Sequence, residues 1–141
     1  MGSIEEVEIL KRRGLAMLEY AREALRRGHN DLAMFFSEQA LQLSTKAVVL
    51  RLLGYTPRTH GVRELLGLVA TALHELGKEE AAAKIAEAAR NRRRELAALE
   101  EAYITSRYLA REFEKEEAEK ALETAAELIK ILKEVEDDVF K

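Results

Sequence analysis

The segment between Asn30 and Leu53 constrains the fold of this chain more than any other. Drawn as a helix, it is apolar over more than half of its circumference, and Gly54 directly follows it. A helix with so wide an apolar face must lie at the centre of a domain, with other elements packed on several sides. The apolar positions are Leu32, Phe35, Phe36, Ala40, Leu43, Ala47, Val48, Leu50 and Leu53.

Elsewhere in the chain, apolar residues recur at intervals of three and four, which is the spacing of one face of a helix. Glycines mark the ends of these runs, as they commonly do for helices. The connector 54–61 contains the only proline. At 103–108, β-branched residues weaken helical propensity and indicate a bend or a loose turn. Besides the central segment, helices are predicted at about 4–27, 62–76, 78–99 and 115–140.

This pattern predicts an all-α fold with one domain over residues 1–141. Short connections place successive helices side by side, so we expect an up-and-down antiparallel bundle of four to five helices. The helices at 30–53 and 115–140 should form most of the core. The apolar face of the first of these is wider than a small bundle would cover, which favours self-association as a homodimer.

The composition excludes several classes of chemistry. The chain has no cysteine and three scattered histidines among 141 residues, which excludes disulfides, thiolate metal sites and cysteine nucleophiles and leaves little for zinc. No metal site and no cofactor are therefore expected. The formal net charge is −3, so any nucleic-acid site must be a local patch.

Composition also bears on location. No apolar run approaches the roughly 18 residues that span a bilayer, and the first residues are acidic, unlike a signal peptide. We therefore expect a cytoplasmic protein without a membrane partner. The scarcity of Asn, Gln and Cys, together with many Glu, Lys and Arg residues, fits proteins of thermophiles.

Three short motifs occur in a fixed order along the chain. The first is Glu38-Gln39-Ala40-Leu41 followed by Lys46-Ala47, the second is Pro57-Arg58-Thr59-His60, and the third is Arg107-Tyr108. Together they resemble the HEPN family (higher eukaryotes and prokaryotes nucleotide-binding domain) in its small stand-alone prokaryotic form. The resemblance extends from about Ala21 to Leu132, and its specificity comes from the order and spacing of all three motifs.

The resemblance implies a bundle of four or five helices that commonly dimerises. Many members are metal-independent ribonucleases that carry an Arg, four to six further residues and then a His near the start of a late helix. Here Arg107 is followed by Tyr-Leu-Ala-Arg-Glu-Phe, without a His, so the catalytic motif is missing where the family places it. The other family role is as the partner of a small nucleotidyltransferase in toxin–antitoxin pairs, with nucleotide binding proposed for a groove lined by polar residues.

Candidate binding residues lie in the second and third motifs and beside them. His60 suits a phosphate or base contact, although it equally suits closure of the loop at a helix start. Tyr103, Arg107 and Tyr108 suit phosphate contact and base stacking, although the rings could simply pack on the bundle. The arginine-rich run 90–94 is better explained as a solvated ion-pair face than as an RNA contact. The candidate nucleotide- or RNA-binding residues are Arg58, Thr59, His60, Arg63, Tyr103, Arg107 and Tyr108.

Two connections between helices should bring these candidate residues together. In an up-and-down bundle, the connections after the second and fourth helices lie at the same end, so the residues around His60 and Arg107 should converge in one electropositive mouth. Lys46 is also notable, because an amine deep in the most apolar helix needs a partner from another helix or a ligand.

Three functions remain open at this point. The first is a binding module for nucleotide or RNA that partners a nucleotidyltransferase. The second is a ribonuclease that uses His60 and Arg107 across a dimer, which the missing late His disfavours. The third is a purely structural interaction bundle, because a stable helical bundle needs no active site.

Overall fold

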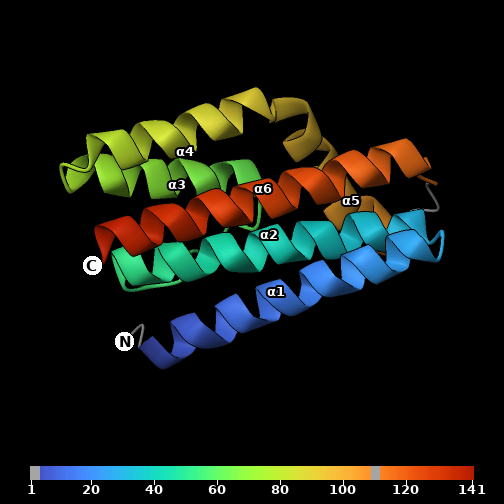
Figure 1. Ribbon diagram of the computed structural model, residues 1–141, viewed down its shortest axis with the longest axis horizontal. Coiled ribbons are helices and arrows are strands. Elements are labelled where there is room, and N and C mark those ends of the chain that lie inside the picture. Colours follow the sequence, from blue (N-terminus) through green and yellow to red (C-terminus); the bar gives the residue numbers. More distant parts are fainter. Residues whose placement is uncertain (1–3, 109–111) are drawn as a thin grey trace.

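The computed structural model describes residues 4–108 and 112–141, and these residues form six helices (Figure 1). This part of the chain contains no β-strand, which confirms the all-α prediction. The predicted stops at Gly28, Gly54 and Gly77 are confirmed, and all three glycines have a positive φ. The helices are α1 (Ile4–Arg26), α2 (Asn30–Leu53), α3 (Val62–Glu75), α4 (Glu79–Asn91), α5 (Arg93–Tyr108) and α6 (Lys115–Val139).

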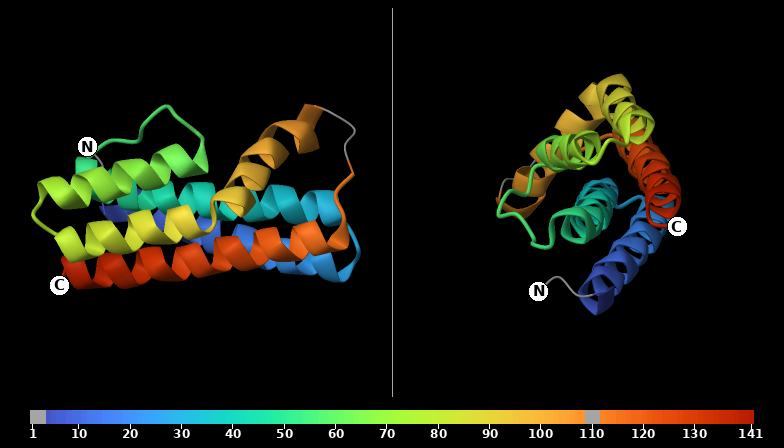
Figure 2. Two further views of the ribbon diagram at one scale, coloured as in Figure 1. Left: turned by 90° about the horizontal axis from the view of Figure 1, so that it is seen from above. Right: turned by 90° about the vertical axis from the view of Figure 1, so that its left-hand side faces the viewer.

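α2 lies at the centre of the bundle, as its wide apolar face predicts. It contacts α1, α3, α5 and α6, which surround it in the end-on view of Figure 2. α6 contributes Leu128, Leu132 and Val135 to the same core. Because four helices of one chain bury the apolar face of α2, its width no longer argues for a dimer.

The connection between α2 and α3 departs from strict up-and-down alternation. After Gly54, the connector 54–61 folds back along α2, so that α3 runs in the same direction as α2 (Figures 1 and 2). The contact of His60 with Lys46, a residue well inside α2, fixes this path. The glycines and the proline of the connector predict that the chain reverses direction once. The connector is long enough for the chain to reverse twice, which leaves α3 running in the same direction as α2.

The segment predicted as one helix to Leu99, followed by a bend at 103–108, is organised differently. The helix breaks at Arg92, which separates α4 from α5, and α5 then continues to Tyr108. Arg92 forms an ion pair with Glu127 on α6 at this break. Beyond it, α5 turns toward α2 and buries Leu96, Leu99 and Ala102. This burial outweighs the weak helical propensity of the β-branched residues.

α1 and α2 approach each other closely at Gly14, in the middle of α1. A Cβ atom at this position would overlap Ser44 Oγ and lie 3.1 Å from the backbone oxygen of Ala40. Glycine usually weakens a helix interior relative to alanine, so its presence here reflects the close packing of the two helices.

We expect Gly14→Ala to lower the free energy of unfolding by about 1–3 kcal/mol, because α1 must shift away from α2 to admit the methyl group. Gly67→Ala is the matched control. Gly67 lies in α3 with no neighbour within 4 Å of an added Cβ, so the same change should raise stability by about 0.5–1 kcal/mol through helical propensity. Urea denaturation measures both. Equal effects of the two substitutions would contradict the close contact.

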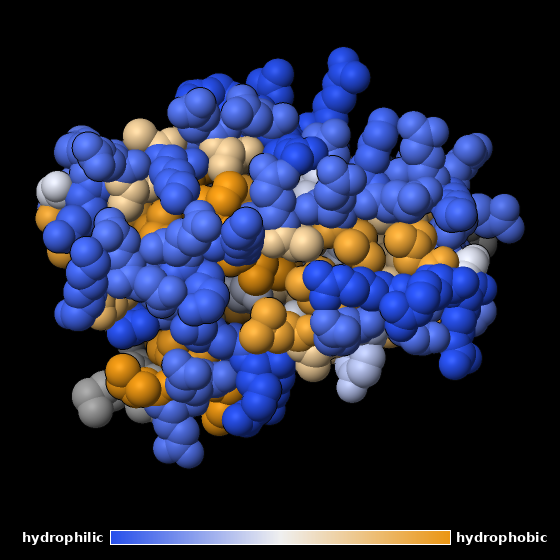
Figure 3. Space-filling view, viewed as in Figure 1, coloured by the Kyte–Doolittle hydropathy of each residue, from blue (hydrophilic) through white to orange (hydrophobic). Residues whose placement is uncertain are grey.

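The surface is largely charged. Hydrophilic side chains cover most of the face seen in Figure 3, and hydrophobic surface is visible mainly along the middle, where α2 and α6 meet. Among the helices that the structure describes, none is both long enough and apolar enough to cross a membrane.

Candidate functional site

A line of polar side chains crosses the otherwise apolar α2. Glu38, Gln42 and Lys46 are spaced four residues apart, which places them one above another on the same face of the helix. All three residues are buried. Buried polar groups are costly unless they are hydrogen-bonded, so such a line on the central helix indicates either a specific structural role or a binding site.

Glu38 is the innermost member of the line. Its carboxylate accepts a hydrogen bond of 2.7 Å from Gln39 Nε2 and another of 2.7 Å from Gln42 Nε2. Burial raises the pKa of Glu38 to about 7, although these hydrogen bonds and the charge of Lys46 act in the opposite direction. Glu38 therefore changes its protonation state near neutral pH.

Lys46 is the outermost member, and its two hydrogen-bond partners are both uncharged groups. Its Nζ lies 3.1 Å from Gln42 Oε1 and 2.8 Å from His60 Nδ1. An ammonium group can only donate, so Nδ1 accepts and the neutral His60 ring carries its proton on Nε2. Burial lowers the pKa of Lys46, and the charge of Glu38 opposes this effect.

Tyr103 lies beside this contact. The rings of His60 and Tyr103 have centroids 5.8 Å apart with an interplanar angle of 39°. His60 belongs to the connector and is exposed, whereas Tyr103 belongs to α5 and is half-buried. The structure thus brings two of the predicted site residues together from distant parts of the sequence.

Arg63 and Thr59 are engaged by neighbouring carboxylates. The guanidinium of Arg63 donates to both carboxylate oxygens of Glu100 on α5, at 2.8 Å and 2.9 Å, and the Arg63 backbone N–H donates to the same group. Burial opposes ionisation of Glu100, but the hydrogen bonds from Arg63 prevail and lower the pKa of Glu100. Thr59 Oγ1 donates to Glu64. This part of the site is therefore less electropositive than the sequence predicts.

Arg58 is exposed, and within the described part of the chain it forms no ion pair. It is two residues from His60 in the connector. Arg107 and Tyr108 belong to the last turn of α5, but their side chains lie outside the described residues. Of the predicted site residues, the structure therefore brings together His60, Tyr103 and Arg63. The structural cause of this arrangement differs from the predicted one. The folded-back connector brings these residues together, where simple alternation of helices would not.

Three residues of the site, Glu38, Gln42 and Glu100, were not predicted as binding residues from the sequence. Gln42 links Glu38 to Lys46, and Glu100 holds Arg63. The four-residue spacing of polar groups on the most apolar helix is a signal that could have identified Gln42. No such signal exists for Glu100, which meets Arg63 across 37 positions of sequence.

Potential metal ligands do not cluster in the residues that the structure describes, where no group of three His, Asp or Glu side chains could hold an ion. The site instead combines amine, imidazole, guanidinium and phenol groups around a buried carboxyl. Such groups suit hydrogen bonding to anions and stacking on planar rings.

Comparison with protein families matches this chain to the HEPN domain over residues 7–135. This chain belongs to the HEPN family. The match confirms the resemblance carried by the three motifs and covers all six helices at least in part. A search of curated proteins gave no match. Membership of the HEPN family supports a nucleotide- or RNA-related role for this helical module.

Proposed function

We propose that this chain is a HEPN nucleotide- or RNA-binding module, and that it partners a small nucleotidyltransferase in a toxin–antitoxin-like pair. The observation that carries the binding proposal is the contact between Lys46 and His60, with the ring of Tyr103 beside it. A buried cation, an imidazole and an aromatic face within one site suit a phosphate joined to a base. Arg58, which precedes His60 by two residues, adds an exposed positive charge.

Binding is favoured over catalysis in this proposal. The late His of the ribonuclease motif is absent after Arg107. The partner is proposed from family membership, and so is a homodimer, which HEPN domains often form. Co-expression with a nucleotidyltransferase encoded beside this chain, followed by size-exclusion chromatography, would test both.

Fluorescence anisotropy with labelled single-stranded RNA and with labelled ATP tests the binding proposal. We expect Arg58→Ala and His60→Ala each to weaken binding by roughly tenfold, because each removes a hydrogen bond to a charged group. Raising the salt concentration should weaken binding by the wild type. Arg13→Ala is the matched control, since Arg13 is an exposed arginine on α1 that forms no ion pair among the described residues.

Each outcome separates the hypotheses. Equal losses in Arg13→Ala and Arg58→Ala would indicate a diffuse charge effect and contradict this site. No binding of either ligand by the wild type would refute the nucleotide proposal and leave a structural interaction bundle. RNA cleavage that His60→Ala abolishes would instead support a ribonuclease.

A further inference from the structure

Lys46 is a buried cation without an anion beside it among the residues that the structure describes. The residue is 8% exposed, yet in the described part of the chain no carboxylate lies within ion-pair distance of its Nζ. An ammonium has three N–H donors, and Gln42 and His60 accept only two of them. A buried charge is costly unless it is paired and fully hydrogen-bonded, so the third donor is suited to an anionic ligand.

Glu136, another buried ionisable residue in the part of the chain that the structure describes, shows the contrast. The carboxylate of Glu136 on α6 is held by two cations, with Lys11 Nζ at 3.0 Å and Arg51 at 2.7 Å. The fold thus pairs this buried charge directly. At Lys46, the acid whose charge acts on the ammonium is Glu38, which is instead separated from it by the amide of Gln42.

The orientation of Gln42 explains how Lys46 is kept in position. Glu38 accepts from the amide nitrogen of Gln42, which turns the amide oxygen of Gln42 toward Lys46. With the oxygen and nitrogen exchanged, two donors would face each other at Lys46. Glu38 and Gln42 are therefore positioning residues. They hold the ammonium by a neutral oxygen and leave its charge uncompensated by direct contact.

We propose, as an extension of the proposed function, that Lys46 binds a terminal phosphate, meaning the phosphate monoester of a nucleotide or of an RNA end. Lys46 is 8% exposed and its Nζ lies 2.8 Å from His60 of the connector, so the end of a ligand reaches it with less hindrance than the middle of a strand does. A phosphate monoester presents three free oxygens and close to two negative charges at neutral pH. An internal phosphodiester has one charge and a sugar on each side. Exposed Arg58 can contact the same phosphate from the connector.

The test compares RNAs of one sequence that carry a 5′-phosphate, a 3′-phosphate or only hydroxyl ends. We expect the wild type to bind either the 5′-phosphorylated or the 3′-phosphorylated RNA about tenfold more tightly than the hydroxyl-ended RNA. This is the gain expected from one hydrogen bond between charged groups. Lys46→Met should abolish this preference, so that the variant binds the phosphorylated and hydroxyl-ended RNAs equally. Competition by AMP but not by adenosine would show that a mononucleotide suffices.

A double variant, Glu38→Gln with Gln42→Glu, guards against an effect of Lys46→Met on folding. It exchanges an acid and an amide of the same shapes, keeps the net charge, and places a carboxylate directly against Lys46. We expect this variant to remain folded and to lose the preference for phosphorylated ends. A role of the two residues in stability alone would leave that preference intact.

The inference and the proposed function fail in different ways. Equal binding of phosphorylated and hydroxyl-ended RNA by the wild type would overturn the terminal-phosphate inference and leave RNA binding standing. A preference that persists in Lys46→Met or in the double variant would overturn the assignment to Lys46. No binding to any of these RNAs or to AMP would refute both.

Discussion

Glu136→Ala should lower the free energy of unfolding by about 3 kcal/mol, which is the expected cost of removing one member of a buried ion pair. The side chain of Glu136 is 1% exposed, and its two oxygens bind Lys11 of α1 and Arg51 of α2. The Arg51 guanidinium also lies 4.1 Å from the centre of the Phe140 ring. Without the carboxylate, two cations would face each other among α1, α2 and α6.

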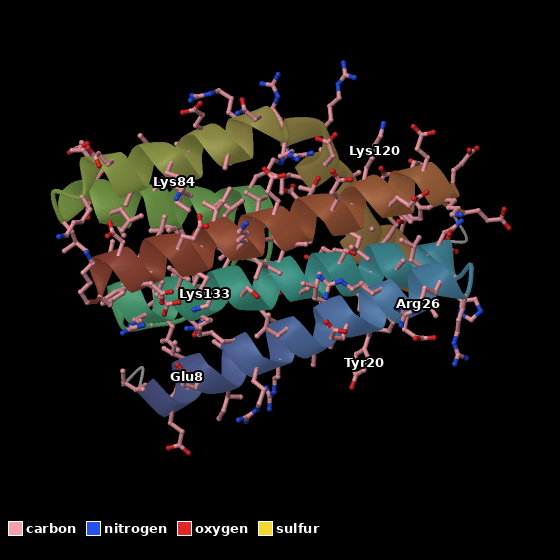
Figure 4. All side chains as sticks on the ribbon, in the orientation of Figure 1. Glu8, Tyr20, Arg26, Lys84, Lys120 and Lys133 are labelled. Carbon is pink, nitrogen blue, oxygen red and sulfur yellow. The ribbon has the colours of Figure 1, made fainter. Side chains whose placement is uncertain are left out.

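Glu134→Ala is the matched control for this prediction. Glu134 lies two residues away on α6 and pairs with Lys84, which Figure 4 labels on α4, at 3.1 Å. Both of these side chains are about half exposed, and exposed pairs typically contribute under about 1 kcal/mol. Chemical denaturation measures both variants. Equal costs for Glu134→Ala and Glu136→Ala would show that the buried pair stabilises the fold no more than a surface pair.

The second large effect concerns pH. Burial raises the pKa of Glu38 from 4.5 to about 7, so between these pH values the folded chain holds a proton that the unfolded chain has lost. Folding then takes up a proton, and the contribution of Glu38 to stability falls as the pH rises through this window. At its full extent, this effect lowers the free energy of unfolding by roughly 3 kcal/mol. The loss of stability is complete above about pH 7 and absent below about pH 4.

Glu38→Gln removes this titration. We expect the free energy of unfolding of the variant, minus that of the wild type, to rise with pH across the window and then to level off. Urea denaturation from pH 4 to pH 8 measures this difference. Glu123→Gln, which removes an exposed carboxylate of α6, controls for the loss of one negative charge and should give a flat difference. A flat difference for Glu38→Gln as well would show that Glu38 titrates as an ordinary carboxyl.

The same titration bears on the site. Lys46 is linked to Glu38 only through Gln42, so protonation of Glu38 withdraws the negative charge that favours the ammonium form of Lys46. The carboxyl, the amide and the amine therefore form one hydrogen-bonded unit.

Much of the candidate site could be located from the sequence, but its contacts could not. The Pro57-Arg58-Thr59-His60 motif identifies the connector, and Tyr103 identifies α5. The contact between His60 and Tyr103 is not visible in either segment alone. Arg63 was predicted to be part of a positive mouth, whereas Glu100 neutralises it. Arg107 and Tyr108 remain predictions, because their side chains lie outside the described residues.

The sequence by itself determined most of the helical segments, where three of them stop, which helix is central and to which family the chain belongs. These properties depend on the spacing of neighbouring residues, on glycine at helix ends and on the order of short motifs. Tertiary structure alone decided the direction of α3, the break at Arg92, and the partners of Lys46 and Glu136. The pairs involved lie far apart in the sequence, by 85 positions for Arg51 and Glu136 and by more for Lys11 and Glu136. Their formation depends on how whole helices pack, which no local pattern of residues encodes.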